Sequence, residues 1–135
     1  MSSPVTDAKS PDSPKTILVV EDNQMLLDLV TSVLSDRGYA VLTADDGLKA
    51  VKIFEQQSRE ISLVLSDMGL PLLGGWEAFL KMKEINPRVK TIMASGYLDP
   101  KLKAEMLSAG AADFIQKPYV IDSLLEKIQQ VLDRP

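Results

Sequence analysis

The chain has 135 residues, enough for one domain with a hydrophobic core but too few for two domains of ordinary size. It contains no Cys and no His, which excludes disulfides, thiol nucleophiles, thiolate metal sites and histidine-based acid–base chemistry. A net charge of −4 argues against direct binding of nucleic acid or an anionic membrane. With no membrane-length apolar run and no signal-peptide pattern, the sequence predicts a cytoplasmic protein.

The beginning of the chain is polar and leads into a first strand and helix. Residues 1–15 are mainly Ser, Pro, Asp and Lys, so we expect a disordered tail before a domain over residues 16–133. The β-branched run Thr16–Val20 predicts a buried strand, which ends on the acidic pair Glu21 and Asp22. A helix should follow, because apolar residues then recur at intervals of three and four. These residues are Leu26, Leu29, Val30, Val33 and Leu34.

The next strands enclose a helix and end in a loop that carries a carboxylate. A strand over Ala40–Ala44 precedes a helix from Gly47, with Asp45 or Asp46 as its N-cap. The residues expected on its inner face are Leu48, Val51 and Phe54. A third strand, the apolar run from Leu63, stops at Asp67. The Gly and Pro residues after it predict a loop at the carboxyl end of a buried strand, where open α/β sheets bind ligands.

The remaining sequence continues the alternation of helix and strand. The expected elements are a helix with Trp76, Phe79, Leu80 and Met82 facing inward, a strand over Lys90–Ala94, a helix between Asp99 and Gly110, a strand over Ala112–Gln116 and a helix over Ile121–Leu132. Five such strands and helices predict an α/β fold with a five-stranded parallel, doubly wound sheet in the flavodoxin-like (βα)5 order 2-1-3-4-5.

That topology brings polar residues from distant parts of the sequence to one edge of the sheet. The residues that follow strands 1, 3, 4 and 5 are Glu21, Asp22, Asp67, Ser95 and Lys117. Two carboxylates about 4 Å apart repel by roughly 4 kcal/mol at an effective dielectric constant near 20, so this cluster requires cations. Lys117 supplies one, and the oxygen-rich set favours Mg²⁺ as another. An Asp beside Lys and Mg²⁺ is suited to accept a phosphoryl group.

These motifs, in this order and spacing, resemble the receiver domain of two-component response regulators, a CheY-like fold, over Thr16 to Leu132. The resemblance implies that Asp67 is the phosphoacceptor and that Ser95 and Lys117 contact the phosphoryl oxygens. It implies Mg²⁺ ligation by Asp22, Asp67 and the Gly69 carbonyl, with Glu21 acting through water. Ser95 and Phe114 match the switch positions, although Phe114 lacks the hydroxyl of a Tyr. Gly69 and Tyr97 match positions that tune dephosphorylation.

The resemblance further implies a signalling switch and not an enzyme, although the domain would slowly hydrolyse its own phosphoryl group. Phosphate would come from a histidine kinase or phosphotransfer domain, while the downstream effector is not defined. The expected output surface is formed by the fourth helix, the fifth strand and the fifth helix. Its candidate contact residues are the exposed polar residues Lys101, Lys103, Glu105 and Asp113. A homodimer, if one forms, is expected to use the same surface. Ser95-Gly96-Tyr97 and the tail are similar to receivers at the C-termini of hybrid histidine kinases. Because the printed sequence ends at Pro135, soon after the last expected helix, we expect either a single-domain regulator or a receiver excised from a longer chain.

Other functions remain as alternatives on the residues alone. An aspartyl-phosphate hydrolase of similar topology usually carries a second Asp two residues after the nucleophile, where this chain has Gly69. A flavodoxin-like electron carrier is disfavoured by the acidic first loop. A receiver-like binding module that is never phosphorylated is a further alternative. Finally, Lys117-Pro118 is expected to be a cis peptide, because Lys117 must point back toward the cluster while the chain turns sharply.

Overall fold

The computed structural model describes residues 14–70, 72–97 and 99–135, so most of the expected tail lies outside the described residues. Strands and helices alternate along the whole described chain. The strands are β1 (Thr16–Val20), β2 (Ala40–Ala44), β3 (Ile61–Asp67), β4 (Thr91–Ser95) and β5 (Asp113–Gln116). The helices are α1 (Gln24–Asp36), α2 (Gly47–Gln57), α3 (Gly75–Ile85), α4 (Pro100–Ser108) and α5 (Ile121–Asp133). None of the helices in these ranges is long and apolar enough to cross a membrane.

The five strands form one parallel sheet in the order β2-β1-β3-β4-β5, which confirms the predicted fold. The strand register aligns the carboxyl ends of the strands at one edge. Val20 is level with Ser66, Asp67 with Ala94, and Ser95 with Gln116. The residues at or directly after the ends of β1, β3, β4 and β5 therefore meet at this edge, as parallel topology requires.

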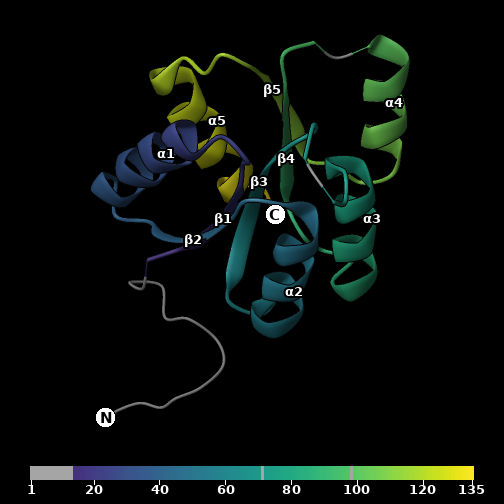
Figure 1. Cartoon of the computed structure of the whole chain (residues 1–135), viewed down its shortest axis with the longest axis horizontal. Coiled ribbons are helices and arrows are strands. Elements are labelled where there is room, and N and C mark those ends of the chain that lie inside the picture. The colour runs from purple at the N-terminus through teal and green to yellow at the C-terminus, as the bar shows by residue number, and fades with distance from the viewer. Residues whose placement is uncertain (1–13, 71, 98) are drawn as a thin grey trace.

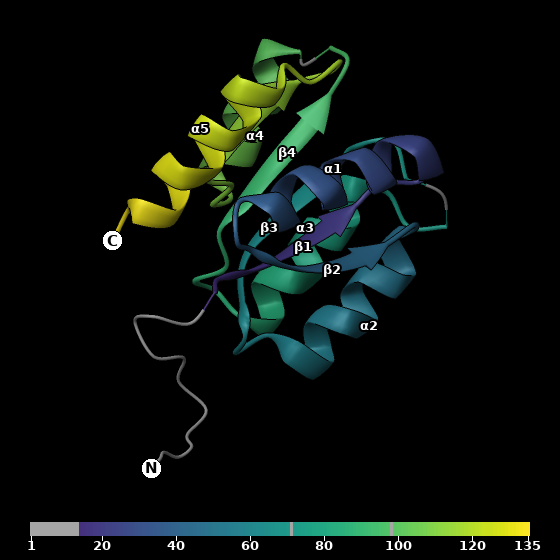
Figure 2. The same cartoon turned by 90° about the vertical axis from the view of Figure 1, so that its left-hand side faces the viewer.

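Alternating strand residues enter two different cores, because successive side chains of a strand point to opposite faces of the sheet. Ile17 and Val19 pack with α1 and α5, whereas Leu18 and Val20 pack with α2 and α3. A third cluster joins α3, α4 and the last two strands through Phe79, Met93, Met106, Ala111 and Phe114. Figure 1 shows α1 and α5 on one side of the sheet and α2, α3 and α4 on the other, and Figure 2 shows α1 and α5 from their outer side.

Leu48 and Leu80 were expected to face inward but are exposed, so these two predictions were wrong. Leu29, one of the apolar residues at helical spacing in α1, is exposed as well. Leu29, Leu48 and Leu80 are 50%, 49% and 41% exposed. In each helix the apolar residues cover a wider arc than the stripe that contacts the sheet, so the periodicity did not define which edge of the arc is buried. In α1, for example, Leu27 is buried, and Leu29 lies about 200° further around the helix. The predicted strand starts at Lys90 and Ala112 also moved inward by one residue.

The N-termini of α1, α2 and α4 are capped by side chains close to the carboxyl edge of the sheet. Asn23, Asp46 and Asp99 accept hydrogen bonds from the backbone N–H groups of Leu26, Lys49 and Leu102. Each cap satisfies an otherwise unpaired donor of the first turn and defines where the preceding loop ends. Of the two candidates for the α2 cap, the structure selects Asp46.

Candidate functional site

Three carboxylates converge at the carboxyl edge of the sheet. Glu21 and Asp22 follow β1, Asp67 ends β3, and one oxygen from each lies within 4.8 Å of the others. Glu21 and Asp67 are 2% and 8% exposed, while Asp22 faces solvent. Hard carboxylate oxygens at this spacing match the ligand preference of Mg²⁺. The donor set of this site therefore fits a magnesium ion.

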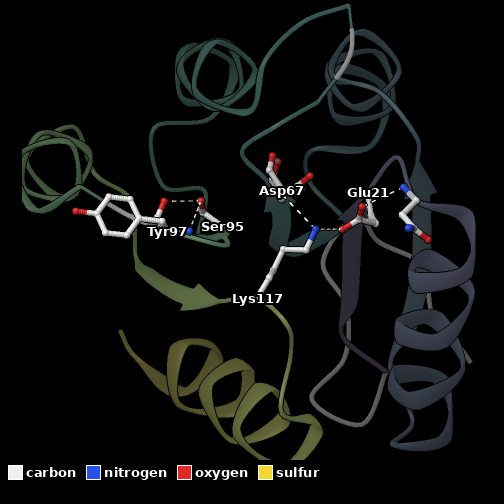
Figure 3. A network of polar contacts seen from close by, with 7 residues as sticks. Glu21, Asp67, Ser95, Tyr97 and Lys117 are labelled. Atoms are coloured by element: carbon white, nitrogen blue, oxygen red, sulfur yellow. Dashed lines mark hydrogen bonds and ion pairs between the residues drawn. The ribbon is translucent and has the colours of Figure 1, made fainter.

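Lys117 supplies a positive charge to this cluster from the end of β5. Its Nζ lies 2.8 Å from Glu21 Oε1 and 3.4 Å from Asp67 Oδ1. Dashed lines mark both contacts in Figure 3. Burial lowers the pKa of Lys117, but the hydrogen bond to Glu21 and the charges of Asp67 and Glu21 outweigh it and raise the pKa above its usual value. The Lys117–Pro118 peptide is cis, as the sequence predicted. Lys117 is thus a permanent cation that bridges strands β1 and β3.

Both oxygens of the Glu21 carboxylate are used within the protein. Oε1 accepts from Lys117, and Oε2 accepts from the backbone N–H of Asn23 at 3.0 Å. Asn23 also caps α1 through its side chain. The sequence analysis did not single out Asn23, although its position directly after the acidic pair at a helix start is a recognisable N-cap signal. Glu21 is therefore held in one orientation by the start of α1.

The Ser95 hydroxyl is engaged with its own loop and not with Asp67. Its Oγ donates to the Tyr97 carbonyl oxygen at 2.7 Å and accepts from the Tyr97 N–H at 3.3 Å. In Figure 3 the Tyr97 ring points away from the carboxylates and Lys117. Tyr97 as a whole is 75% exposed. Topology thus brings Ser95 to the correct edge of the sheet, but its hydrogen bonds tie it to the loop after β4.

Phe114 is 4% exposed, so it already lies inside the protein in this structure. Its ring packs in the third cluster, with the Lys103 ammonium 5.5 Å from the ring centroid. Its carbonyl oxygen accepts a hydrogen bond from Lys127 of α5 at 2.8 Å. An open cavity of about 400 Å³ lies beside it, lined by Ser95, Tyr97, Lys103, Phe114, Ile115 and Gln116. The two expected switch residues therefore border one cavity.

Asp113 was expected to be exposed, but it is only partly exposed, and its role as a contact residue stays a prediction. Its side chain is 26% exposed and pairs with Lys127 at 3.2 Å and with Arg134 at 3.1 Å. Burial raises the pKa of Asp113, but the Phe114 N–H, Lys127 and Arg134 together lower it below its usual value. The sequence separation between these residues hid the ion pairs. Lys101, Lys103 and Glu105 are exposed, as expected.

Tyr119 is a residue near the site that sequence reasoning missed. Burial, and then the negative charges of Glu21 and Asp67, raise its pKa well above the usual value, so the phenol stays neutral. Together with Asn23, Leu26, Leu29, Lys117, Pro118 and Ile121, it lines a second open cavity, of about 550 Å³. Gly69, the expected carbonyl ligand, lies in the loop that follows β3, with open space where a side chain would be.

Comparisons with known proteins agree with this fold and site. The sequence model of the response regulator receiver domain family matches residues 17–129, so the chain belongs to this family. It is 38% identical over 117 residues to the CAI-1 autoinducer sensor kinase/phosphatase CqsS of Vibrio cholerae, covering 84% of this chain but only 17% of that protein. It is 30% identical to the chemotaxis protein CheY of Bacillus subtilis, covering 87% of this chain and 97% of that one.

A solved structure adds information about the metal. The receiver domain of the sensor histidine kinase PA1611 from Pseudomonas aeruginosa superimposes with a TM-score of 0.79 at 28% identity, covering 90% of this chain and 100% of that one. That structure contains a magnesium ion coordinated in its active-site cleft. Receiver domains are phosphoacceptors in two-component signalling and bind Mg²⁺ at an acidic site, so the chain is a domain of this signalling class.

Proposed function

We propose that Asp67 accepts a phosphoryl group from a phosphohistidine of a histidine kinase or phosphotransfer domain. One carboxylate oxygen of Asp67 attacks phosphorus, the new O–P bond forms as the N–P bond of the donor breaks, and the imidazole leaves with the bonding electron pair. The product is an aspartyl-phosphate. The observation that carries this proposal is the position of Lys117 between the buried carboxylates of Glu21 and Asp67, beside Asp22.

Lys117 and Ser95 are proposed to stabilise the transferred group. The Lys117 ammonium is 3.4 Å from Asp67, so it can pair with a phosphoryl oxygen on that residue by a small movement away from Glu21. Ser95 must first release the Tyr97 carbonyl before its hydroxyl can donate to a phosphoryl oxygen. Phosphorylation would therefore exchange a hydrogen bond within the β4–α4 loop for one to the phosphoryl group.

Mg²⁺ is proposed to be held by Asp22, Asp67 and the Gly69 carbonyl, with Glu21 acting through water. The ion would supply positive charge to the transferring phosphoryl oxygens. Three carboxylates with a single lysine leave the cluster with excess negative charge, which supports cation binding. The same neutralisation allows a dianionic group to approach Asp67.

The proposed output is a change of the surface formed by α4, β5 and α5. Release of Ser95 from Tyr97 would alter the loop before α4 and the walls of the cavity beside Phe114. Because Phe114 is already buried, this response would take the form of repacking around the ring. A partner that prefers one of the two packings would detect phosphorylation as a population shift. Slow hydrolysis of the aspartyl-phosphate would end the signal.

Labelling with acetyl phosphate tests the proposal directly. With Mg²⁺ present, borohydride trapping and mass spectrometry should place the label on Asp67. Asp67→Asn or chelation of the metal should abolish it, whereas Asp36→Asn, a change in an exposed carboxylate of α1, should not. Full labelling of Asp67→Asn, or labelling that survives chelation, would rule out the mechanism.

A further inference from the structure

The first turn of α2 lies in direct contact with the loop that follows Asp67. A Cβ atom built on Gly47 would be 2.0 Å from the carbonyl oxygen of Leu73 and 2.8 Å from its Cβ. Real Cβ atoms essentially never approach a neighbour within 3.0 Å, so any side chain here requires the Leu73 carbonyl to move by at least about 1 Å. This contact involves backbone and not the end of a flexible side chain.

We propose that Gly47 is a positioning residue for the phosphoacceptor site. It would act through the loop after β3, of which the structure describes residues 68–70 and 72–74, and would hold that loop in place by leaving room for Leu73. The inference rests on the proposed function of Asp67 and assigns a role to a residue that follows β2, remote in sequence from β3. Gly47 touches none of the reacting groups, so its role would be to set their positions through the loop.

The loop is held both at its ends and between them, which is why a displacement at Leu73 should reach the site. Its two ends are joined by the Gly75 N–H, which donates to the carbonyl oxygen of Met68, directly after Asp67, at 3.1 Å. Between the ends, Leu70 and Leu73 pack against the core cluster beneath α2 and α3. A loop held in this way moves as a unit when one anchor is pushed. Gly69, whose carbonyl is the proposed metal ligand, lies between the anchors.

α2 is poorly placed to absorb the clash by moving away. Ala50 and Phe54, on its inner face, are both 0% exposed and pack in the same core. Asp46 is 6% exposed and caps the helix through the Lys49 N–H at 2.8 Å. Displacing the helix would therefore open a well-packed core and disturb its cap. The loop, whose Leu72 is 77% exposed, is the part that should yield.

The test is Gly47→Ala in the intact chain. A 1 Å misplacement of reacting groups can lower a rate by roughly 100-fold, and loss of a supporting contact typically lowers metal affinity by roughly 10- to 100-fold. We expect the Kd for Mg²⁺ alone, from calorimetric titration, to rise about 10-fold. Labelling by acetyl phosphate should slow by at least about 10-fold, with the far-UV circular dichroism unchanged.

Ala50→Gly is the matched control, because it weakens the same helix without adding an atom near the loop. It should lower the midpoint of urea unfolding but leave the Mg²⁺ affinity unchanged. If Ala50→Gly loses Mg²⁺ affinity to the same extent, or if Gly47→Ala retains the wild-type affinity and labelling rate, the positioning role is wrong.

A second variant decides the matter if Gly47→Ala does not fold. Leu73→Gly loosens the same contact from the side of the loop without added bulk, and it should also weaken Mg²⁺ binding; retained affinity would overturn the inference. Failure of the proposed function looks different, because the wild-type chain itself would then not be labelled on Asp67.

Discussion

Replacing Lys117 by Met should destabilise the metal-free protein by about 3 kcal/mol. The charges 2.8 and 3.4 Å from Nζ interact with it by about 6 and 5 kcal/mol at an effective dielectric constant near 20, before the cost of desolvation. Removing one partner of a buried pair costs about 3–5 kcal/mol. The Lys117 side chain is 22% exposed and that of Glu21 is 3% exposed, so water screens part of the interaction and the lower value applies.

Urea unfolding in the presence of EDTA measures this loss. Lys52→Met, at an exposed lysine of α2, is the control and should change stability by less than about 0.5 kcal/mol. Mg²⁺ should restore part of the loss in Lys117→Met, because the ion neutralises the same carboxylates. Adding Glu21→Gln to Lys117→Met should also recover stability, since no buried charge is then left unpaired at Glu21. A loss below about 1 kcal/mol, the range of a surface pair, would refute the reasoning.

Three further predictions concern stability. Thr91 is 0% exposed and its hydroxyl has no hydrogen-bond partner among the described residues, so Thr91→Val should raise the free energy of unfolding by about 1 kcal/mol in urea titrations. Leu72 has an exposed side chain and a φ of 66°, a backbone conformation that glycine adopts more easily than leucine, so Leu72→Gly should stabilise the fold by roughly 0.5–1 kcal/mol. Leu107→Gly, at an exposed leucine of α4, is the control and should destabilise the fold. Asp113→Asn should lower the free energy of unfolding by about 1 kcal/mol near neutral pH. The pKa of Asp113 is lowered from its ordinary value of 3.8, so the stability that its carboxylate contributes is present above that pH and is lost as the pH falls through the lower, folded-state pKa. A difference in stability between wild type and Asp113→Asn that persists in acid would contradict the ion pairs.

The sequence by itself determined the order of the elements and the residues at the carboxyl edge of the sheet. Short β-branched runs, helical spacing and Gly or Pro boundaries are local signals, and they identified all five strands within one or two residues of their ends. The doubly wound order then follows from the handedness of the crossovers, which places the residues after β1 and β3 side by side. The grouping of Glu21, Asp22, Asp67 and Lys117 therefore follows from the sequence alone, and these side chains do lie together in the structure.

Only the tertiary structure decided how those residues and their neighbours are paired. Lys117 lies closer to Glu21 than to Asp67, Ser95 is bound to Tyr97, and Asp113 is paired with Lys127 and Arg134. The exposure of Leu29, Leu48 and Leu80 and the contact of Gly47 with Leu73 were likewise absent from the pattern. Periodicity reports which residues share a face of one element. Pairing and close approach depend on how whole elements pack against one another, and that depends on contacts between residues far apart in the chain.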